Sequence, residues 1–451
     1  MSLTAQLEPP PAARLDRFGR SWADRRVTVV GLGRSGRAAA ELLRRVGASV
    51  RVTEASQGGE LADAQAALSA QGIEVEIGRH SRRMIEDADA IVVSPGIADS
   101  SAPIRWALDA GLPVLSEIEL AFCFCPSPVV AVTGTNGKST AVTLIAEIAK
   151  ASGRQAIACG NLGIPFASVV DRLTPSALAI VEVSSFQLLR CERFRPRIGL
   201  LLNIGTNHLD RHHDPDAYFA AKARLFQRQT PEDWAVLNGS DPRIVALGER
   251  LPARRVWFGD NRSNPPALRL ADETRAALPD SAQAVLQVAR LLEIADPLAW
   301  QAIRSFRGLE HRLEHVATLR GVHFINDSKS TTPDSLLFAL SRTPGSLVVI
   351  LGGRDKGMDY GVLAGPLHDG RIKGAVLIGE ARSRLRALFN GSPTVVERQT
   401  LAQAVETAAE LAEPGTSVLF SPAAASFDMF KNFEERGRAF KEIVRAMSPS
   451  S

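Results

Sequence analysis

The chain has 451 residues, of which 45% are hydrophobic and 23% charged, and its 53 basic residues face 49 acidic ones. This length allows roughly three domains that each bury a core, and the composition is that of an ordinary globular protein. A net charge of +4 without a basic block argues against nucleic acid as a partner.

The cysteines and the N-terminus narrow the class of protein further. Four cysteines lie in or beside apolar segments and form no C-x-x-C, which favours a reduced, cytoplasmic protein without disulfides. Cys123 and Cys125 could form a metal or redox pair, although buried packing is the more common use of such residues. No apolar run has the roughly 18 residues that membrane insertion needs. Residues 1–25 are rich in proline and charge, which predicts a loose or partly helical arm.

The first predicted domain covers residues 26–125. A β-type run at 26–30 ends in Gly31-Leu32-Gly33-Arg34-Ser35-Gly36, a helical stretch follows, and a second β-type run at 49–53 ends at Glu54. This is the dinucleotide fingerprint in its proper context, and taken alone it indicates a nicotinamide enzyme. Further β-type runs at 73–77, 90–93 and 114–115 complete a Rossmann-like domain.

A glycine-rich phosphate loop opens the second predicted domain, residues 126–308. The apolar run at 128–132 ends in Thr133-Gly134-Thr135-Asn136-Gly137-Lys138-Ser139-Thr140, and a helical stretch follows. In such loops backbone N–H groups and the lysine hold phosphates, and the hydroxyl after the lysine binds Mg²⁺. Val132 stands where the usual pattern has its first glycine, so the bare pattern is an imperfect match.

Two acid or histidine positions follow strands of this second domain. Glu182 lies near the end of the run at 177–183, where an open α/β sheet binds ligands, and it is therefore placed to reach a metal held by Ser139. The cluster from His208 to Asp214 resembles a zinc site, but a single histidine beside a Mg²⁺ and phosphate site is the better interpretation.

The third predicted domain covers residues 309–451. Its β-type runs at 322–325, 347–351, 375–378 and 417–420 all end in polar or glycine residues, which is typical of a second nucleotide-facing sheet. The expected fold class is therefore α/β with three domains: Rossmann-like, P-loop ATPase-type and Rossmann-like.

The order of these motifs resembles the Mur ligases of peptidoglycan synthesis over nearly the whole chain. The resemblance rests on residues 134–140, Gly160-Asn161-Leu162-Gly163, Glu182 to Leu188, Asn203 to His212, His311-Arg312, Asn326 to Lys329, Leu351-Gly352-Gly353 and Ser421-Pro422. Residues 184–188, 311–314 and 426–437 are most like the family members that add D-glutamate.

The resemblance implies a reaction and its substrates. ATP would phosphorylate the terminal carboxylate of UDP-N-acetylmuramoyl-L-alanine, and the amine of D-glutamate would attack the acyl phosphate. A monomer with two Mg²⁺ ions is expected. A related amide ligase that adds L-glutamate, another amino acid or glutamate to a folate is the alternative, and the sequence alone does not derive the chirality.

The resemblance also assigns residues to the ATP and metal sites. Lys138, Lys222 and His208 would be catalytic, Lys222 as a carbamylated lysine, and the metal ligands would be Ser139, Glu182 and His208. ATP would be held by Gly134, Thr135, Asn136, Gly137, Lys138, Ser139, Thr140, Gln283, Arg312, Asp327 and Lys329.

The two remaining substrates receive separate sets of residues. The first fingerprint would hold UDP rather than NAD, because its geometry binds any diphosphate. The UDP substrate would contact Gly31, Gly33, Ser35, Gly36, Glu54, Gly96, Asn161 and Ser184, and glutamate would contact Thr331, Lys356, Ser426 and Phe433. Four positions depart from the family pattern: Asn207, Gln283, Thr332 and Phe427.

Overall fold

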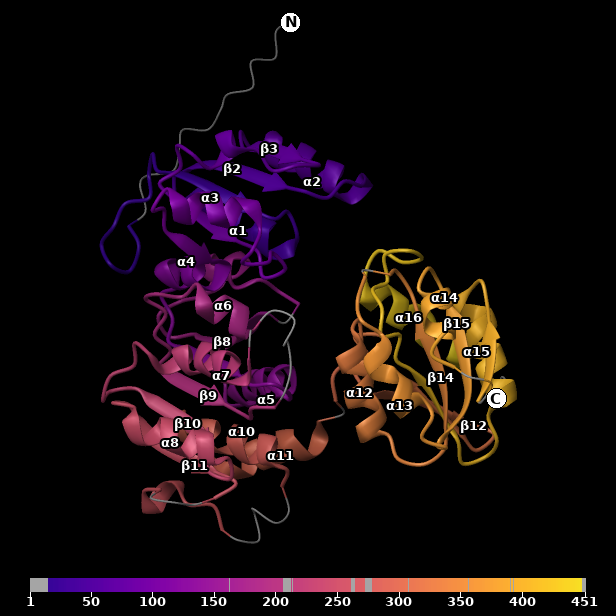
Figure 1. The fold of residues 1–451 in the computed structure, drawn as a ribbon. Helices are drawn as coiled ribbons and strands as arrows, with labels where there is room; N and C mark the ends of the chain where they lie inside the picture. Colours follow the sequence, from indigo (N-terminus) through magenta and orange to yellow (C-terminus); the bar gives the residue numbers. More distant parts are fainter. Residues whose placement is uncertain are drawn as a thin grey trace, which may run out of the picture. The chain divides into compact units, whose positions relative to one another are not determined.

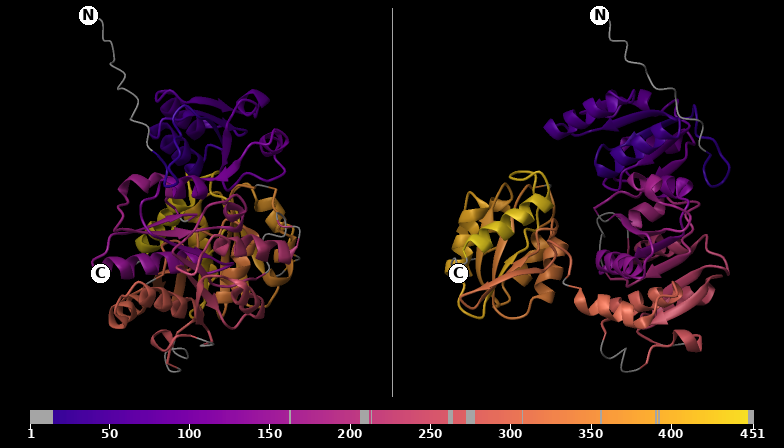
Figure 2. Two further views of the ribbon diagram at one scale, coloured as in Figure 1. Left: turned by 90° about the vertical axis from the view of Figure 1, so that its left-hand side faces the viewer. Right: turned by 180° about the vertical axis from the view of Figure 1, so that it is seen from behind.

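The computed structural model describes residues 15–161, 163–205, 212, 214–260, 264–271, 278–306, 308–355, 357–389, 391 and 393–447. The chain divides into two compact units, Met1–Phe306 and Arg307–Ser451. The first unit contains two parallel sheets and the second contains one mixed sheet (Figure 1 and Figure 2).

The first sheet has the doubly wound order β3-β2-β1-β4-β5, with all its pairs parallel. Its strands are β1 (Arg26–Val30), β2 (Ser49–Glu54), β3 (Glu74–Ile77), β4 (Ala90–Val93) and β5 (Val114–Ser116). The accompanying helices are α1 (Arg34–Arg45), α2 (Gly59–Ser69), α3 (Ala102–Asp109) and α4 (Glu117–Phe124). The strand order reverses between β1 and β4, and open α/β sheets bind their ligands at such a switch point, beside the turn after β1.

The second sheet has the order β11-β10-β9-β6-β8-β7 and is also parallel. Its strands are β6 (Val129–Thr133), β7 (Ala156–Gly160), β8 (Leu178–Glu182), β9 (Ile198–Leu201), β10 (Trp234–Asn238) and β11 (Arg254–Phe258). Its helices are α5 (Lys138–Ala151), α6 (Ser185–Leu189), α7 (Pro215–Ala223), α8 (Pro242–Arg250), α10 (Asp280–Leu291) and α11 (Asp296–Ser305).

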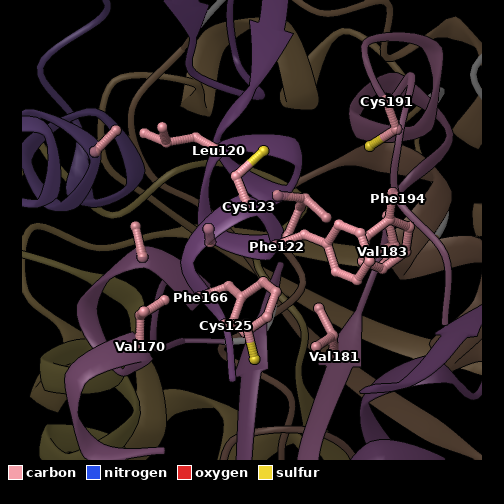
Figure 3. Packing of buried hydrophobic residues seen from close by; sticks show 14 of the residues in the cluster. Leu120, Phe122, Cys123, Cys125, Phe166, Val170, Val181, Val183, Cys191 and Phe194 are labelled. Atoms are coloured by element: carbon pink, nitrogen blue, oxygen red, sulfur yellow. The ribbon is translucent and has the colours of Figure 1, made fainter. Parts of the chain in front are cut away.

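Alternate residues of the central strands serve two different cores. In β6, Val130 and Val132 pack against α5 and α10, whereas Val129 and Ala131 face a cluster that continues into the first sheet. Figure 3 shows the middle of this shared cluster, where Phe122 of α4 lies near Val181 and Val183. The shared core explains why the two sheets form one unit.

The second unit is a mixed sheet of order β12-β13-β17-β14-β15-β16, in which only β12 runs antiparallel. Its strands are β12 (Glu314–Leu319), β13 (Val322–Asn326), β14 (Leu347–Gly352), β15 (Ile372–Ile378), β16 (Thr394–Glu397) and β17 (Ser417–Phe420). Helices α12 (Pro333–Arg342), α13 (Ala364–Leu367), α14 (Arg382–Arg386), α15 (Leu401–Leu411) and α16 (Phe433–Ala446) cover its faces. The expected α/β class is confirmed in both units.

The part of the arm that the structure describes, residues 15–25, is a closed turn without a helix. Leu15 and Ser21 form an isolated bridge around the buried carboxylate of Asp16, which accepts bonds from the Trp22 indole and the Arg20 guanidinium. The expected helical character is therefore absent from this stretch, because polar contacts to Asp16 replace helical hydrogen bonds.

All four cysteines are free and buried, and Cys123 and Cys125 pack in the shared core. Burial raises the pKa of Cys123 to about 12, so its thiolate is scarce at neutral pH. Over the described ranges, no helix is long and apolar enough to cross a membrane.

Glu117, the first residue of α4, has a buried carboxyl group that we expect to make the folding stability depend on pH. Its Oε1 accepts a bond of 2.5 Å from the Ala167 N–H, while Oε2 is buried without a described partner. Burial raises its pKa to about 7 from 4.5, and the N–H groups of Ala167 and Phe166 offset only part of this effect. The folded state therefore binds this proton more tightly than the unfolded state does. The contribution of Glu117 to folding stability is fully present below about pH 4.5 and is lost as the pH rises through about 7.

The raised pKa of Glu117 corresponds to a loss of about 3 kcal/mol in the free energy of unfolding between low and high pH. We expect Glu117→Gln to remove most of this pH dependence, because the amide does not titrate. The measurement is the Tm of wild type and variant between pH 5 and pH 8, with the exposed Glu86→Gln as the control. An equal fall in Tm for wild type and Glu117→Gln would contradict the assignment.

Candidate functional site

The phosphate loop lies between β6 and α5, as the sequence predicts. Gly137 has φ +81° and begins the helix, and Gly134 has φ +152°, a conformation that residues with a side chain rarely adopt. The Lys138 ammonium donates to the carbonyls of Gly134 and Thr135, each at 2.9 Å. The lysine is therefore folded over a loop whose backbone N–H groups and helix N-terminus favour an anion.

A carboxylate from β8 meets the hydroxyl that follows this lysine. Ser139 Oγ donates to Glu182 Oε2 at 2.7 Å, and Asn161 Nδ2 donates to Glu182 Oε1 at 2.8 Å. Glu182 is only 3% exposed. A hydroxyl and a carboxylate side by side are the hard oxygen ligands that Mg²⁺ prefers, so the chemistry of this pair fits the expected metal.

Lys222 reaches the same loop from α7. Its ammonium donates to the Gly134 carbonyl at 2.9 Å, so it shares one acceptor with Lys138, and it lies 4.6 Å from the centre of the Tyr218 ring. Burial lowers the pKa of Lys222 well below its ordinary value, the Lys138 charge lowers it further, and Glu182 opposes both. A neutral amine therefore becomes accessible at this position.

Two predicted site residues, His208 and Lys356, lie outside the described residues, as does Asn207, which departs from the family pattern. Of the nearby histidines the structure describes His212, whose Nε2 lies 2.9 Å from Ser185 Oγ and whose ring stacks on Phe186. No group of three or more His, Cys, Asp or Glu side chains suited to a metal occurs in the described part of the chain.

The structure adds a residue that sequence reasoning did not assign to the site. Asn203, which follows β9, accepts the N–H groups of Thr135 and Asn136 through its Oδ1 at 3.1 and 2.9 Å. Tyr218 OH lies 3.2 Å from Thr135 Oγ1. The only sign of this role in the sequence is that Asn203 follows a predicted strand of the same sheet. Its partners in the phosphate loop lie 67 and 68 residues away in sequence.

The turn after β1 forms a second glycine cradle at a helix N-terminus in the same unit. Gly31 has φ +96°, and a Cβ on Gly36 would stand 1.9 Å from the Gly31 carbonyl oxygen. Gly33 is exposed at the start of α1 with no side-chain cap, so the helix N-terminus stays open beside Ser35. The exposed Gly96 follows β4, the strand paired with β1.

The carboxylate of Glu54 is hydrogen-bonded to the backbone of this cradle. Its carboxylate oxygens accept the N–H groups of Leu32 at 2.9 Å and Ser56 at 2.8 Å. Burial works to raise the pKa of Glu54, but these two donors outweigh it and the pKa is lowered. A charged Glu54 thus fixes the first glycine turn to the loop after β2.

Two predicted nucleotide or sugar contacts are already engaged within the fold. Ser184 caps α6 in a capping box with Gln187, and Gln283 bonds the Gly259 N–H through Oε1 and the Leu278 carbonyl through Nε2. Gln283 is 3% exposed, so its amide ties α10 to the strand end beside it.

Most of the described predicted residues of the second unit follow the carboxyl ends of β13 and β17. Asp327 is buried and accepts the Ser421 hydroxyl at 2.8 Å and the Leu313 N–H at 3.1 Å. Burial raises its pKa to about 6, although Ser421 and the charges of Arg312 and Lys329 oppose this. The other predicted residues of this edge are Thr331, Ser426 and Phe433, the last being the first residue of α16.

Buried Arg436 holds the loops of this edge together. Its guanidinium donates to Ser328 Oγ at 3.1 Å, the Ser328 carbonyl at 2.8 Å and the Ala424 carbonyl at 3.0 Å. Sequence reasoning placed the segment that contains it but assigned it no role.

Family models match three consecutive parts of the chain. Residues 25–116 match the Mur ligase MurD-like N-terminal domain, residues 132–283 the Mur ligase middle domain, and residues 311–424 the Mur ligase glutamate ligase domain. Together they cover all strands of the three sheets except the first residues of β6, and both glycine cradles.

Curated relatives match along nearly the whole chain. The UDP-N-acetylmuramoylalanine–D-glutamate ligase of Desulfosudis oleivorans is 38% identical over 445 residues, which cover 94% of this chain and 97% of the relative. The enzyme of the same name from Chlorobium limicola is 41% identical over 463 residues, which cover 94% and 99%.

Solved structures share the fold at low sequence identity. UDP-N-acetylmuramate-alanine ligase MurC from Thermotoga maritima has a TM-score of 0.55 at 17% identity and covers 94% of this chain and 100% of its own. MurF ligase from Thermotoga maritima in complex with ADP has a TM-score of 0.56 at 14% identity, with coverages of 89% and 96%. With the model matches and the full-length relatives, these similarities establish that the chain belongs to the Mur ligase family and that its N-terminal domain is of the MurD-like type.

Proposed function

We propose that this ATP-dependent ligase joins D-glutamate to UDP-N-acetylmuramoyl-L-alanine in peptidoglycan precursor synthesis. The observation that carries the proposal is full-length similarity to enzymes named for that reaction, in a chain that keeps the Lys138 loop and Glu182 together. We propose that it acts in the cytoplasm as a monomer, with the three functional regions at residues 26–125, 126–308 and 309–451.

The reaction would proceed in two steps. The γ-phosphoryl group would pass from ATP to a carboxylate oxygen, releasing ADP and leaving an acyl phosphate. The glutamate nitrogen would then attack the acyl carbon, phosphate would leave, and the amine would give its proton to solvent. Phosphoryl transfer depends mainly on positioning and on charge neutralisation, so the protein needs little covalent chemistry of its own.

The loop residues would supply that positioning. Lys138, already folded over its loop, would place its charge on the phosphates, while the N–H groups of residues 134–137 hold their oxygens. Ser139 and Glu182 would hold Mg²⁺, which supplies charge neutralisation to the phosphates, and His208 would serve a second ion. Asp327, Lys329 and Arg312 are the further residues that we propose as ATP contacts.

The remaining assignments follow the two other substrates. The cradle of Gly31, Gly33 and Gly36 would take the UDP diphosphate at the N-terminus of α1, with Glu54 ordering the turn. In the second unit, Lys356 would neutralise a glutamate carboxylate, and hydroxyls and backbone groups around Thr331 and Ser426 would bond it.

A phosphate-release assay tests the proposal. Purified protein with ATP and Mg²⁺ should release phosphate only when UDP-N-acetylmuramoyl-L-alanine and D-glutamate are both present. L-glutamate and meso-diaminopimelate are the matched amino-acid controls. Release with L-glutamate and none with D-glutamate would overturn the proposal and support an L-glutamate ligase of the same fold.

We also propose that Lys222 is carbamylated. A neutral amine attacks CO₂, the new N–C bond forms and one proton leaves, so the product carries a negative charge. The lowered pKa of Lys222 makes its neutral amine available. The positive charge of Lys138 repels the ammonium form of Lys222 but would attract the negatively charged carbamate. The product would also add a carboxylate near Glu182.

Labelling with ¹³CO₂ tests the modification directly. We expect a carbamate ¹³C NMR signal in wild type and in the exposed control Lys150→Ala, and no such signal in Lys222→Met. Lys222→Met removes the carbamate, and we expect turnover to fall on the order of a hundredfold. Residues that bond to metal ligands, without binding the metal themselves, typically have effects of this size when they are replaced. An unchanged signal in Lys222→Met would place the carbamate elsewhere.

A further inference from the structure

Both oxygens of the Glu182 carboxylate are held before any metal binds. Ser139 donates to Oε2 at 2.7 Å, and Asn161 donates to Oε1 at 2.8 Å. The carboxylate is 3% exposed, so it cannot reorient freely toward solvent. Partners that bond a metal-binding carboxylate from behind fix its orientation and tune its affinity.

The fold fixes Asn161 in this position through the backbone as well. Its own N–H donates to the Glu182 carbonyl at 2.9 Å, so main chain and side chain of Asn161 both bond to one residue. The turn before it requires Gly160, which has φ +97° and where a Cβ would lie 2.3 Å from the Glu182 carbonyl oxygen. β7 and β8 therefore deliver the amide to the carboxylate with little freedom.

Asn161 also faces outward, which distinguishes it from Glu182. The residue is exposed, and its amide oxygen has no hydrogen-bond partner among the described residues. The amide of Asn161 thus lies between the buried Glu182 carboxylate and solvent, at the carboxyl ends of β7 and β8. One N–H is used on Glu182, while the oxygen and the second N–H bond no residue that the structure describes.

We propose that Asn161 is a positioning residue for the Mg²⁺ centre: its amide holds Glu182 Oε1 so that Oε2 stays beside Ser139 as a metal ligand. The inference rests on the proposed use of Mg²⁺ and ATP, and it goes beyond the contact with the UDP substrate that the sequence predicts for the same residue. Removal of the amide frees the carboxylate to turn and weakens metal binding even without the UDP substrate.

Mn²⁺ binding, followed by electron paramagnetic resonance with a non-hydrolysable ATP analogue and no UDP substrate, tests the role. We expect Asn161→Ala and the similarly sized Asn161→Leu to raise the Mn²⁺ Kd roughly tenfold or more. Ile164→Ala is the matched control, because its side chain is 47% exposed on the same loop while its carbonyl still accepts the Gly160 N–H. All variants should keep the Tm of the control.

The outcomes separate this inference from the proposed function. An unchanged Mn²⁺ Kd in both Asn161 variants, with only the KM for the UDP substrate raised, would overturn it and leave Asn161 as a substrate contact alone. Absence of Mn²⁺ binding in wild type with the ATP analogue would instead contradict the proposed metal-dependent use of ATP.

Discussion

Lys138→Ala is expected to abolish phosphate release while binding of UDP-N-acetylmuramoyl-L-alanine survives. The ammonium lies on the Gly134 and Thr135 carbonyls, and no other described residue contributes a lysine from within the loop. Its loss removes a positive charge from the loop proposed to hold the phosphates of ATP. We expect turnover to fall by at least about a thousandfold, the upper range for one electrostatic contact.

The matched control is Lys150→Ala, which removes an exposed lysine from the other end of the same helix. Calorimetric titration with the UDP substrate should give the same Kd for wild type, Lys138→Ala and Lys150→Ala, because the proposed UDP cradle is on the first sheet. Loss of UDP-substrate binding in Lys138→Ala alone would contradict this division of the two nucleotides.

Local chemistry explains why the two glycine cradles were predictable from sequence. A strand, a glycine turn and a helix follow each other directly in residues 26–45 and again in residues 129–151, so each cradle forms from local sequence, and both turns occur where they were expected. The placement of Glu182 beside Ser139 followed from a rule about parallel sheets, since carboxyl ends of neighbouring strands share one edge. The α/β class and the family resemblance are confirmed.

The elements that sequence reasoning missed have weak or atypical patterns. β7 reads Ala-Ile-Ala-Cys-Gly, with a single β-branched residue, and β12 is an antiparallel edge strand whose pattern mixes polar and apolar residues. β16 is a short edge strand with no buried residue. Strands of these kinds gain their stability from the neighbour they pair with, which the local sequence does not specify.

Long-range polar contacts were equally inaccessible from local patterns. Asn203 anchors the phosphate loop across the sheet, and Arg436 ties Ser328 to Ala424 through a fully buried guanidinium. Gln283, predicted to contact ATP, bonds two backbone groups, the Gly259 N–H and the Leu278 carbonyl. In each case the residue type is ordinary, and only the tertiary fold decides which acceptor it meets.

The second large effect is expected at the turn after β1, where two glycines differ in their surroundings. A Cβ on Gly36 would lie 1.9 Å from the Gly31 carbonyl oxygen and 2.8 Å from Ser94 Oγ, whereas a Cβ on Gly33 meets nothing within 4 Å. The clash at Gly36 involves backbone, so no rotamer relieves it. We expect Gly36→Ala to destabilise the first unit by about 3 kcal/mol or more and to abolish UDP-substrate binding.

Gly33→Ala is the matched variant, because φ at Gly33 is −70° and an alanine fits there without strain. It should keep the wild-type Tm but weaken UDP-substrate binding, since the added methyl group stands where a diphosphate would approach the helix N-terminus. The measurements are Tm by differential scanning fluorimetry and Kd by calorimetry. Wild-type affinity in a folded Gly33→Ala would show that the diphosphate does not contact this turn, and the site of Lys138 and Glu182 would be unaffected by that result.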